Sequence, residues 1–152
     1  MKHLLETERL YFREFTINDA QLIVDLNSDP RVTKYTEYGA ITTLADAEKK
    51  LRTDLLLQYP NKLGRWAVFL KSNNEFIGWC GLKYIEKENI HTLGYRFFYS
   101  HWGKGYATEA AKASLDYGMN ILKLKSICAK AMKENTASIN VMKKTWNGLP
   151  ER

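Results

Sequence analysis

One stretch decides how the chain is interpreted: Trp102-Gly103-Lys104-Gly105-Tyr106-Ala107-Thr108-Glu109-Ala110. It follows an aromatic segment typical of a β-strand, Tyr95-Arg96-Phe97-Phe98-Tyr99, and it opens a segment rich in small residues that predicts a helix. Glycine tolerates positive φ and lets a ligand approach the backbone, and a helix begins with unpaired N–H groups and a positive dipole end. The stretch is therefore either an ordinary turn or a cradle for a phosphate group.

The composition is that of a single globular domain. The chain has 152 residues, of which 45% are hydrophobic and 26% are charged. It contains no run of about 18 apolar residues, as a membrane span requires, and no pattern typical of a signal peptide. Cys80, Cys128 and three histidines show no spacing typical of a metal or redox site. We therefore expect one cytoplasmic domain over residues 1–152, with no metal ion and no membrane partner.

The net charge of +6 is unevenly distributed. Residues 101–152 carry nine basic and four acidic side chains, so most of the excess lies around and after the glycine turn. Such a surface is either simply solvated or complementary to a polyphosphate ligand or to RNA. Because the chain has no aromatic motif of an RNA-binding domain, we do not expect a nucleic-acid partner.

Hydrophobic periodicity and turn residues predict a mixed α/β fold. Strands are expected over residues 10–15, 66–70, 76–82, 91–98 and 126–131. Helices are expected over about 18–26, 43–58, 107–119 and 135–144. The residues between 83 and 89 read as a polar turn.

This order of elements, with a Gly-x-Gly turn after the fourth strand, resembles the GCN5-related N-acetyltransferase (GNAT) superfamily, in particular its branch of ribosomal-protein N-terminal acetyltransferases (RimJ/RimL-type). The resemblance covers about residues 6–144 and implies a mixed, mostly antiparallel twisted sheet flanked by helices. It also implies transfer of an acetyl group from acetyl-CoA to a primary amine, either a protein N-terminus or a small molecule such as a polyamine. The matching segments are Glu6-Thr7-Glu8-Arg9-Leu10 with Arg13, Ser28-Asp29-Pro30 with Val32, Phe76-Ile77-Gly78 with Gly81, Leu93-Gly94-Tyr95, Trp102 to Ala110, and Glu134-Asn135 with Ser138.

The resemblance places the family's pyrophosphate signature on Ser100 to Gly105, with serine where glutamine or arginine is usual. It implies that backbone N–H groups of the turn and the first helical residues bind the pyrophosphate. These residues are Trp102, Gly103, Lys104, Gly105, Tyr106, Ala107 and Thr108. Phe97 and Phe98 are expected to bind the pantetheine arm through their backbone, in the manner of an added strand.

The resemblance also implies roles on the last helix. An acidic tyrosine of several family members falls on Met142, so that role does not transfer. The ribosomal-protein branch uses a serine, which implies that Ser138 protonates the leaving thiolate while Asn135 assists by binding the cofactor arm. From the residues alone, Asn135 is also a plausible helix N-cap and Ser138 a packing residue.

Candidates for the base and the acceptor pocket rest on residue chemistry. A glutamate common in the family is replaced by Thr92, so His91, with an unperturbed pKa near 6.5, is the candidate base. The alternative is that His91 is merely exposed. Tyr35, Trp79 and Tyr84 are candidates to line the acceptor pocket, although buried aromatic residues are more often part of the core.

Residues 145–152 depart from the family pattern, in which a Lys-Leu-Gly segment leads to two further strands. One inserted A in the lysine codons before Thr145 would convert such a segment into Thr145-Trp146-Asn147-Gly148, so we hypothesise a frameshifted tail and the loss of those strands. The strand near Ile127 would then have an unpaired edge and could form a homodimer through it. The alternative function is therefore a non-catalytic or inactive, truncated acyl-CoA-binding module.

Overall fold

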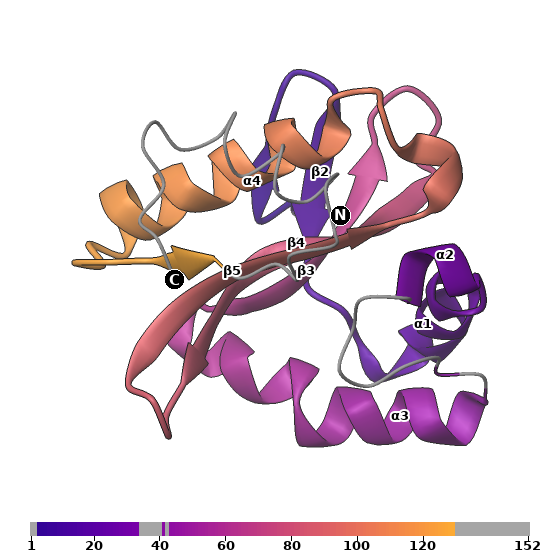
Figure 1. The fold of residues 1–152 in the computed structure, drawn as a ribbon, viewed down its shortest axis with the longest axis horizontal. Coiled ribbons are helices and arrows are strands. Elements are labelled where there is room, and N and C mark those ends of the chain that lie inside the picture. Colours follow the sequence, from indigo (N-terminus) through magenta and orange to yellow (C-terminus); the bar gives the residue numbers. More distant parts are fainter. Residues whose placement is uncertain (1–2, 34–40, 42, 130–152) are drawn as a thin grey trace.

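The computed structural model describes residues 3–33, 41 and 43–129 (Figure 1). Within these residues, six strands form a sheet in the order β1-β2-β3-β4-β5-β6, in which neighbours are antiparallel except for the parallel pair β5 and β6. This confirms the predicted mixed, mostly antiparallel sheet. The strands are β1 (Leu5–Glu6), β2 (Leu10–Arg13), β3 (Gly64–Leu70), β4 (Phe76–Ile85), β5 (Ile90–Phe97) and β6 (Cys128–Ala129).

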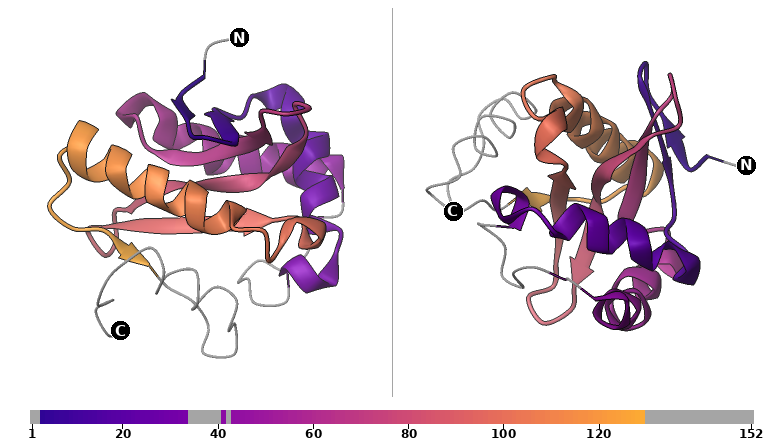
Figure 2. Two further views of the ribbon diagram at one scale, coloured as in Figure 1. Left: turned by 90° about the horizontal axis from the view of Figure 1, so that it is seen from above. Right: turned by 90° about the vertical axis from the view of Figure 1, so that its right-hand side faces the viewer.

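Helices cover both faces of the sheet (Figure 2). One face packs against α4 (Tyr106–Asp116), and the other packs against α1 (Ala20–Asn27) and α3 (Leu44–Thr53), with the short α2 (Pro30–Thr33) beside α1. Buried residues accordingly form two clusters, one of which contains Trp66, Leu82 and Leu115 and the other Phe15, Ile23 and Leu51. Because both faces are covered, the central strands read as continuous apolar runs. None of the helices in the described ranges is long and apolar enough to cross a bilayer.

Threonine side chains cap two helical segments, the 3-10 helix η1 (Ile17–Asp19), which leads into α1, and the helix α3. The Thr16 hydroxyl accepts a hydrogen bond from the Asn18 N–H at 3.2 Å, and the Thr43 hydroxyl accepts one from the Asp46 N–H at 3.1 Å. The predicted helix over 43–58 is wrong in its second half. At Asp54 the backbone leaves the helical region, with φ −139° and ψ −68°, and a 3-10 helix, η2 (Leu55–Asn61), follows. The Asp54 carboxylate binds Lys50 and Lys83, which favours this break.

Other boundaries also differ from the prediction. Strand β2 ends at Arg13 rather than at residue 15, and β4 continues to Ile85, because the polar residues after Leu82 pair with the start of β5. Helix α4 ends at Asp116 and a π-helical turn, η4 (Tyr117–Ile121), follows it. Strand β1, of two residues, was too short to predict. The predicted helix over 135–144, the tail over 145–152 and the expected loss of two strands lie outside the described residues.

Candidate functional site

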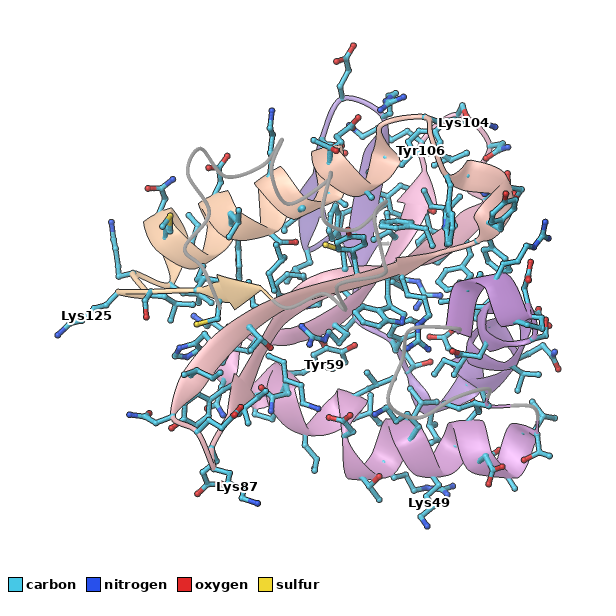
Figure 3. The ribbon with its side chains drawn as sticks, in the orientation of Figure 1. Lys49, Tyr59, Lys87, Lys104, Tyr106 and Lys125 are labelled. Atoms are coloured by element: carbon cyan, nitrogen blue, oxygen red, sulfur yellow. The ribbon has the colours of Figure 1, made fainter. Side chains whose placement is uncertain are left out.

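The glycine turn connects the end of β5 to the start of α4. After the 3-10 helix η3 (Tyr99–His101) the chain passes through Gly103, with φ +75°, and Gly105, with φ +83°, and α4 begins at Tyr106. Side chains rarely tolerate such φ values, which explains both glycines. Figure 3 shows Lys104 and Tyr106 at this end of α4.

The turn has room and donors for an anion. A Cβ atom added at Gly103 would meet nothing within 4 Å. The first hydrogen bond of α4 runs from the Glu109 N–H to the Gly105 carbonyl at 3.0 Å, so the N–H groups of Tyr106, Ala107 and Thr108 come before it. The N-cap residue is Gly105, which has no side chain to satisfy them. This geometry favours the cradle over an ordinary turn.

Trp102 fixes the turn to the end of β5. Its indole N–H donates to the Phe97 carbonyl at 2.9 Å, and its ring lies 4.8 Å from the Tyr99 ring. The Phe98 N–H donates to the Ile77 carbonyl of the β4 strand at 3.0 Å. Because successive N–H groups of a strand point to opposite edges, the Phe97 N–H points away from β4.

That edge of β5 is only partly covered. Within the described residues, β6 pairs with Thr92 and Leu93 alone, so the stretch from Gly94 to Phe97 extends past it. Phe97 and Phe98, the residues expected to bind the pantetheine arm, therefore lie beside the turn, at the end of β5 that no described strand covers. The structure does bring together the cofactor residues expected in the described part of the chain, from Phe97 to Thr108.

The N-terminal hairpin holds the turn from the other side. The Arg9 guanidinium binds the Glu109 carboxylate, with 2.7 Å between Nε and Oε1, and donates to the Lys104 carbonyl at 3.1 Å. It also lies 4.4 Å from the centre of the Tyr106 ring, and the Thr7 hydroxyl donates to Glu109. Sequence analysis found these residues only as family-like positions; their contact across about a hundred positions had no local signal.

Ionised Glu109 is stabilised by this contact. Burial opposes its ionisation, but hydrogen bonds from the Thr7 hydroxyl and from the Arg9 backbone and side chain outweigh that effect and lower its pKa below the ordinary value. A lowered pKa in the folded protein means that the extra stability is present above the ordinary glutamate pKa. It is lost as the pH falls through the folded-state pKa.

We therefore expect Glu109→Gln to lower the free energy of unfolding at pH 7 by about 1 kcal/mol, since the ion pair is partly exposed. The difference from the wild type should shrink as the pH is lowered from 7 to 3. Urea unfolding at both pH values measures it. Asp116→Asn, on the same helix, is the matched control, because no ion pair of the described residues involves Asp116. A destabilisation that is equal at both pH values would mean that the ionised Glu109 carboxylate does not stabilise the fold.

The predicted catalytic residues are not all brought to this site. His91 lies near the start of β5, with its ring 5.0 Å from the ring of Tyr84, its partner on β4. It is six residues before Phe97, or about 20 Å along the strand. Thr92 is buried and its hydroxyl lies 3.4 Å from Nη2 of Arg65. Ser138, Asn135 and Tyr35 lie outside the described residues.

Trp79, a candidate to line the acceptor pocket, lies beside two arginines. The Cζ atoms of two arginines lie near its ring, Arg65 at 5.3 Å and Arg96 at 5.6 Å from the centroid. Sequence analysis missed both arginines, because their grouping depends on strand register.

As for metal binding, the part of the chain that the structure describes contains no group of three or more His, Cys, Asp or Glu side chains able to hold an ion.

Comparison with known proteins identifies the family and the fold. A family model described as "Acetyltransferase (GNAT) domain" matches residues 9–145. An uncharacterized N-acetyltransferase, p20, of Bacillus licheniformis is 37% identical over 139 residues, which are 91% of this chain and 78% of that protein. The crystal structure of a GNAT-family acetyltransferase from Bacillus anthracis is 30% identical, with a TM-score of 0.80, and the match covers 93% of this chain and 81% of that one.

A more distant structure has the same fold. RimL, a ribosomal L7/L12 alpha-N-protein acetyltransferase solved in complex with coenzyme A, has a TM-score of 0.80 at 17% identity, over 95% of this chain and 82% of that one. At that identity the likeness concerns the fold alone. The family match over residues 9–145 and the relative of 37% identity lead to one conclusion: the chain belongs to the GNAT acetyltransferase family.

Proposed function

We propose that the protein transfers the acetyl group of acetyl-CoA to a primary amine, the amino group of a protein N-terminus or of a small molecule. The observation that carries the proposal is the turn at Gly103 to Gly105, which combines empty space with unpaired N–H groups at the start of α4. Members of the GNAT family use acetyl-CoA, and the resemblance of the sequence implies that their pyrophosphate signature falls on this turn.

The residues present fit that co-substrate. The N–H groups of Tyr106, Ala107 and Thr108 would hold the pyrophosphate, together with the positive end of the α4 dipole. Gly103 would let it approach the backbone, and the Lys104 side chain adds positive charge beside it. The Phe97 N–H would bind the pantetheine arm along the end of β5 beyond Leu93. Acetyl-CoA, when bound, supplies an activated thioester as the acetyl donor.

The chemistry requires a neutral amine placed against the thioester and a proton donor for the leaving thiol. In the proposed reaction the amine nitrogen forms a bond to the acetyl carbon, and the bond from that carbon to sulfur breaks. The nitrogen loses a proton and the sulfur gains one. We propose Ser138 as the donor to sulfur and Asn135 as its neighbour on the cofactor arm. His91 remains the candidate base, although its place on β5 requires a water relay.

The experiment that tests the proposal combines binding with turnover. Calorimetry with acetyl-CoA should give a saturable heat with a 1:1 stoichiometry, and release of free thiol should require an added amine. A KM for acetyl-CoA between about 1 μM and 1 mM is expected. Absence of acetyl-CoA binding would overturn the proposal.

Binding without turnover on any amine would instead favour the alternative, a non-catalytic acyl-CoA-binding module. The relatives described above are named as acetyltransferases, which gives that alternative no support.

A further inference from the structure

Two arginines meet on the face of the sheet that packs against α1 and α3. Arg65 starts on β3, opposite Gly81 of β4, and its side chain crosses that strand. Its Nη1 donates to the Gly81 carbonyl at 3.0 Å and to the Thr92 carbonyl of β5 at 3.1 Å. A Cβ atom added at Gly94 would lie 2.9 Å from the Arg65 Cζ. The Arg65 guanidinium therefore lies on β5, in the space left by the missing side chain of Gly94.

Arg96 stands two residues farther along the same strand and on the same face. Side chains two positions apart on a strand are about 7 Å apart, so the two guanidinium groups are neighbours. Trp79 is the direct partner of Arg96 on β4, and both guanidinium groups lie within 6 Å of its ring centroid. This group of three side chains, Arg65, Trp79 and Arg96, is called the arginine pair site below.

Within the described residues, Arg96 has one hydrogen-bond acceptor and no carboxylate partner. Its Nη1 donates to Oδ1 of Asn27, a side chain only 2% exposed on α1. In the described part of the chain no carboxylate forms an ion pair with Arg96, and four of its five N–H donors have no hydrogen-bond partner there. Burial, and then the positive charge of Arg65, lower the pKa of Arg96 to about 10. The planar guanidinium group binds carboxylate and phosphate anions through paired N–H donors.

The arginine pair site borders the cofactor turn along β5. Gly94 and Arg96 belong to the stretch of β5 that extends past β6, and the next residue, Phe97, binds Trp102 of the cofactor turn. If the thioester lies along this edge, as the proposed function requires, the two guanidinium groups are beside it.

We propose that the arginine pair site binds the acceptor and that the acceptor is a small primary amine that also carries a carboxylate, as an α-amino acid does. The inference rests on the proposed function. A carboxylate accepts paired hydrogen bonds from the planar guanidinium fork. The positive field of the pair also lowers the pKa of an amine held beside it, so that more of the amine is neutral and able to attack. The same field repels polyamines.

The test compares amines that differ in the carboxylate alone. Acetylation of the twenty common α-amino acids is measured beside their amides, with spermidine as the polycationic amine. We expect kcat/KM for the best amino acid to exceed that of its amide at least tenfold, and we expect no turnover of spermidine. Amides that are acetylated as well as the acids, or efficient turnover of spermidine, would overturn the inference while leaving the proposed function intact.

Single substitutions test whether Arg96 binds the carboxylate of the acceptor. Arg96→Gln should lower kcat/KM for the amino acid at least tenfold and for the amide less than threefold, with an unchanged Kd for acetyl-CoA. Arg96→Lys should restore part of the preference for the amino acid over its amide. Arg52→Gln removes an equally charged but exposed residue of α3 and should leave the ratio unchanged. Equal losses for acid and amide in Arg96→Gln would mean that the residue only supports the fold. If no amine is acetylated, the proposed function fails and this inference fails with it.

Discussion

Gly103→Asp is expected to raise the Kd for acetyl-CoA by about a thousandfold, and Gly103→Asn by about tenfold. The two variants place side chains of the same size in the space that the glycine leaves open. Two like charges about 5 Å apart repel by about 3 kcal/mol at an effective dielectric constant of about 20, which is roughly a hundredfold in affinity. The difference between the variants therefore measures the charge of the ligand, and their common loss measures the space it occupies.

Both variants should fold. Asn and Asp tolerate positive φ better than most residues, so each should lower the free energy of unfolding by only about 1 kcal/mol, and by similar amounts. Calorimetric titration with coenzyme A gives the affinities, and urea unfolding checks the fold. If both variants bind coenzyme A as the wild type does, the segment is an ordinary turn and the assignment of its backbone to the pyrophosphate is wrong.

The second large effect concerns the stability of the central sheet. Gly81→Ala should lower the free energy of unfolding by at least about 3 kcal/mol. The new Cβ atom would lie 1.9 Å from the carbonyl oxygen of Gly64 on the neighbouring strand. That oxygen belongs to the backbone, so the β3 and β4 strands would have to separate to make room. A variant that shows no cooperative unfolding transition at all agrees with this expectation.

Gly94→Ala is the matched comparison, because Gly94 pairs directly with Gly81. Its Cβ atom would meet the Arg65 guanidinium at 2.9 Å, which is the far end of a flexible side chain and can move. We expect a loss of about 1 kcal/mol, similar to that of a typical hydrogen bond. Thermal or urea unfolding of both variants measures the contrast. Equal destabilisation would show that Arg65 is held as rigidly as the backbone.

The sequence was sufficient for much of the fold. The strands that contain Trp66 and Ile77 are long apolar runs, and helical segments begin just after Thr16 and Thr43, close to where they were expected. The end of α3 was not predictable from periodicity, because the apolar stripe continues through Leu55 and the break depends on contacts of Asp54 with lysines on different elements.

The part of the candidate site that is continuous in the sequence could be predicted, and the part assembled from separate strands could not. The cofactor turn is one continuous segment, in which the glycines and the helix start carry the signal. The arginine pair site is assembled from three strands and was not found, since only the register places Arg65 and Arg96 on one face of β5. The assigned catalytic residues on the last helix came from family resemblance, and Ser138 lies outside the described residues.

The contact between Arg9 and Glu109 has a consequence for the order in which the protein matures. The hairpin that contains Arg9 leaves the ribosome before its partners at Lys104 and Glu109, which are synthesised about 5 to 20 s later at ordinary translation rates. Closing so long a loop is a slow step in folding. The contacts at the start of α4 are therefore completed by a segment that was made about a hundred residues earlier. A fusion partner or a deletion at the N-terminus would thus reduce coenzyme A affinity from outside the glycine signature.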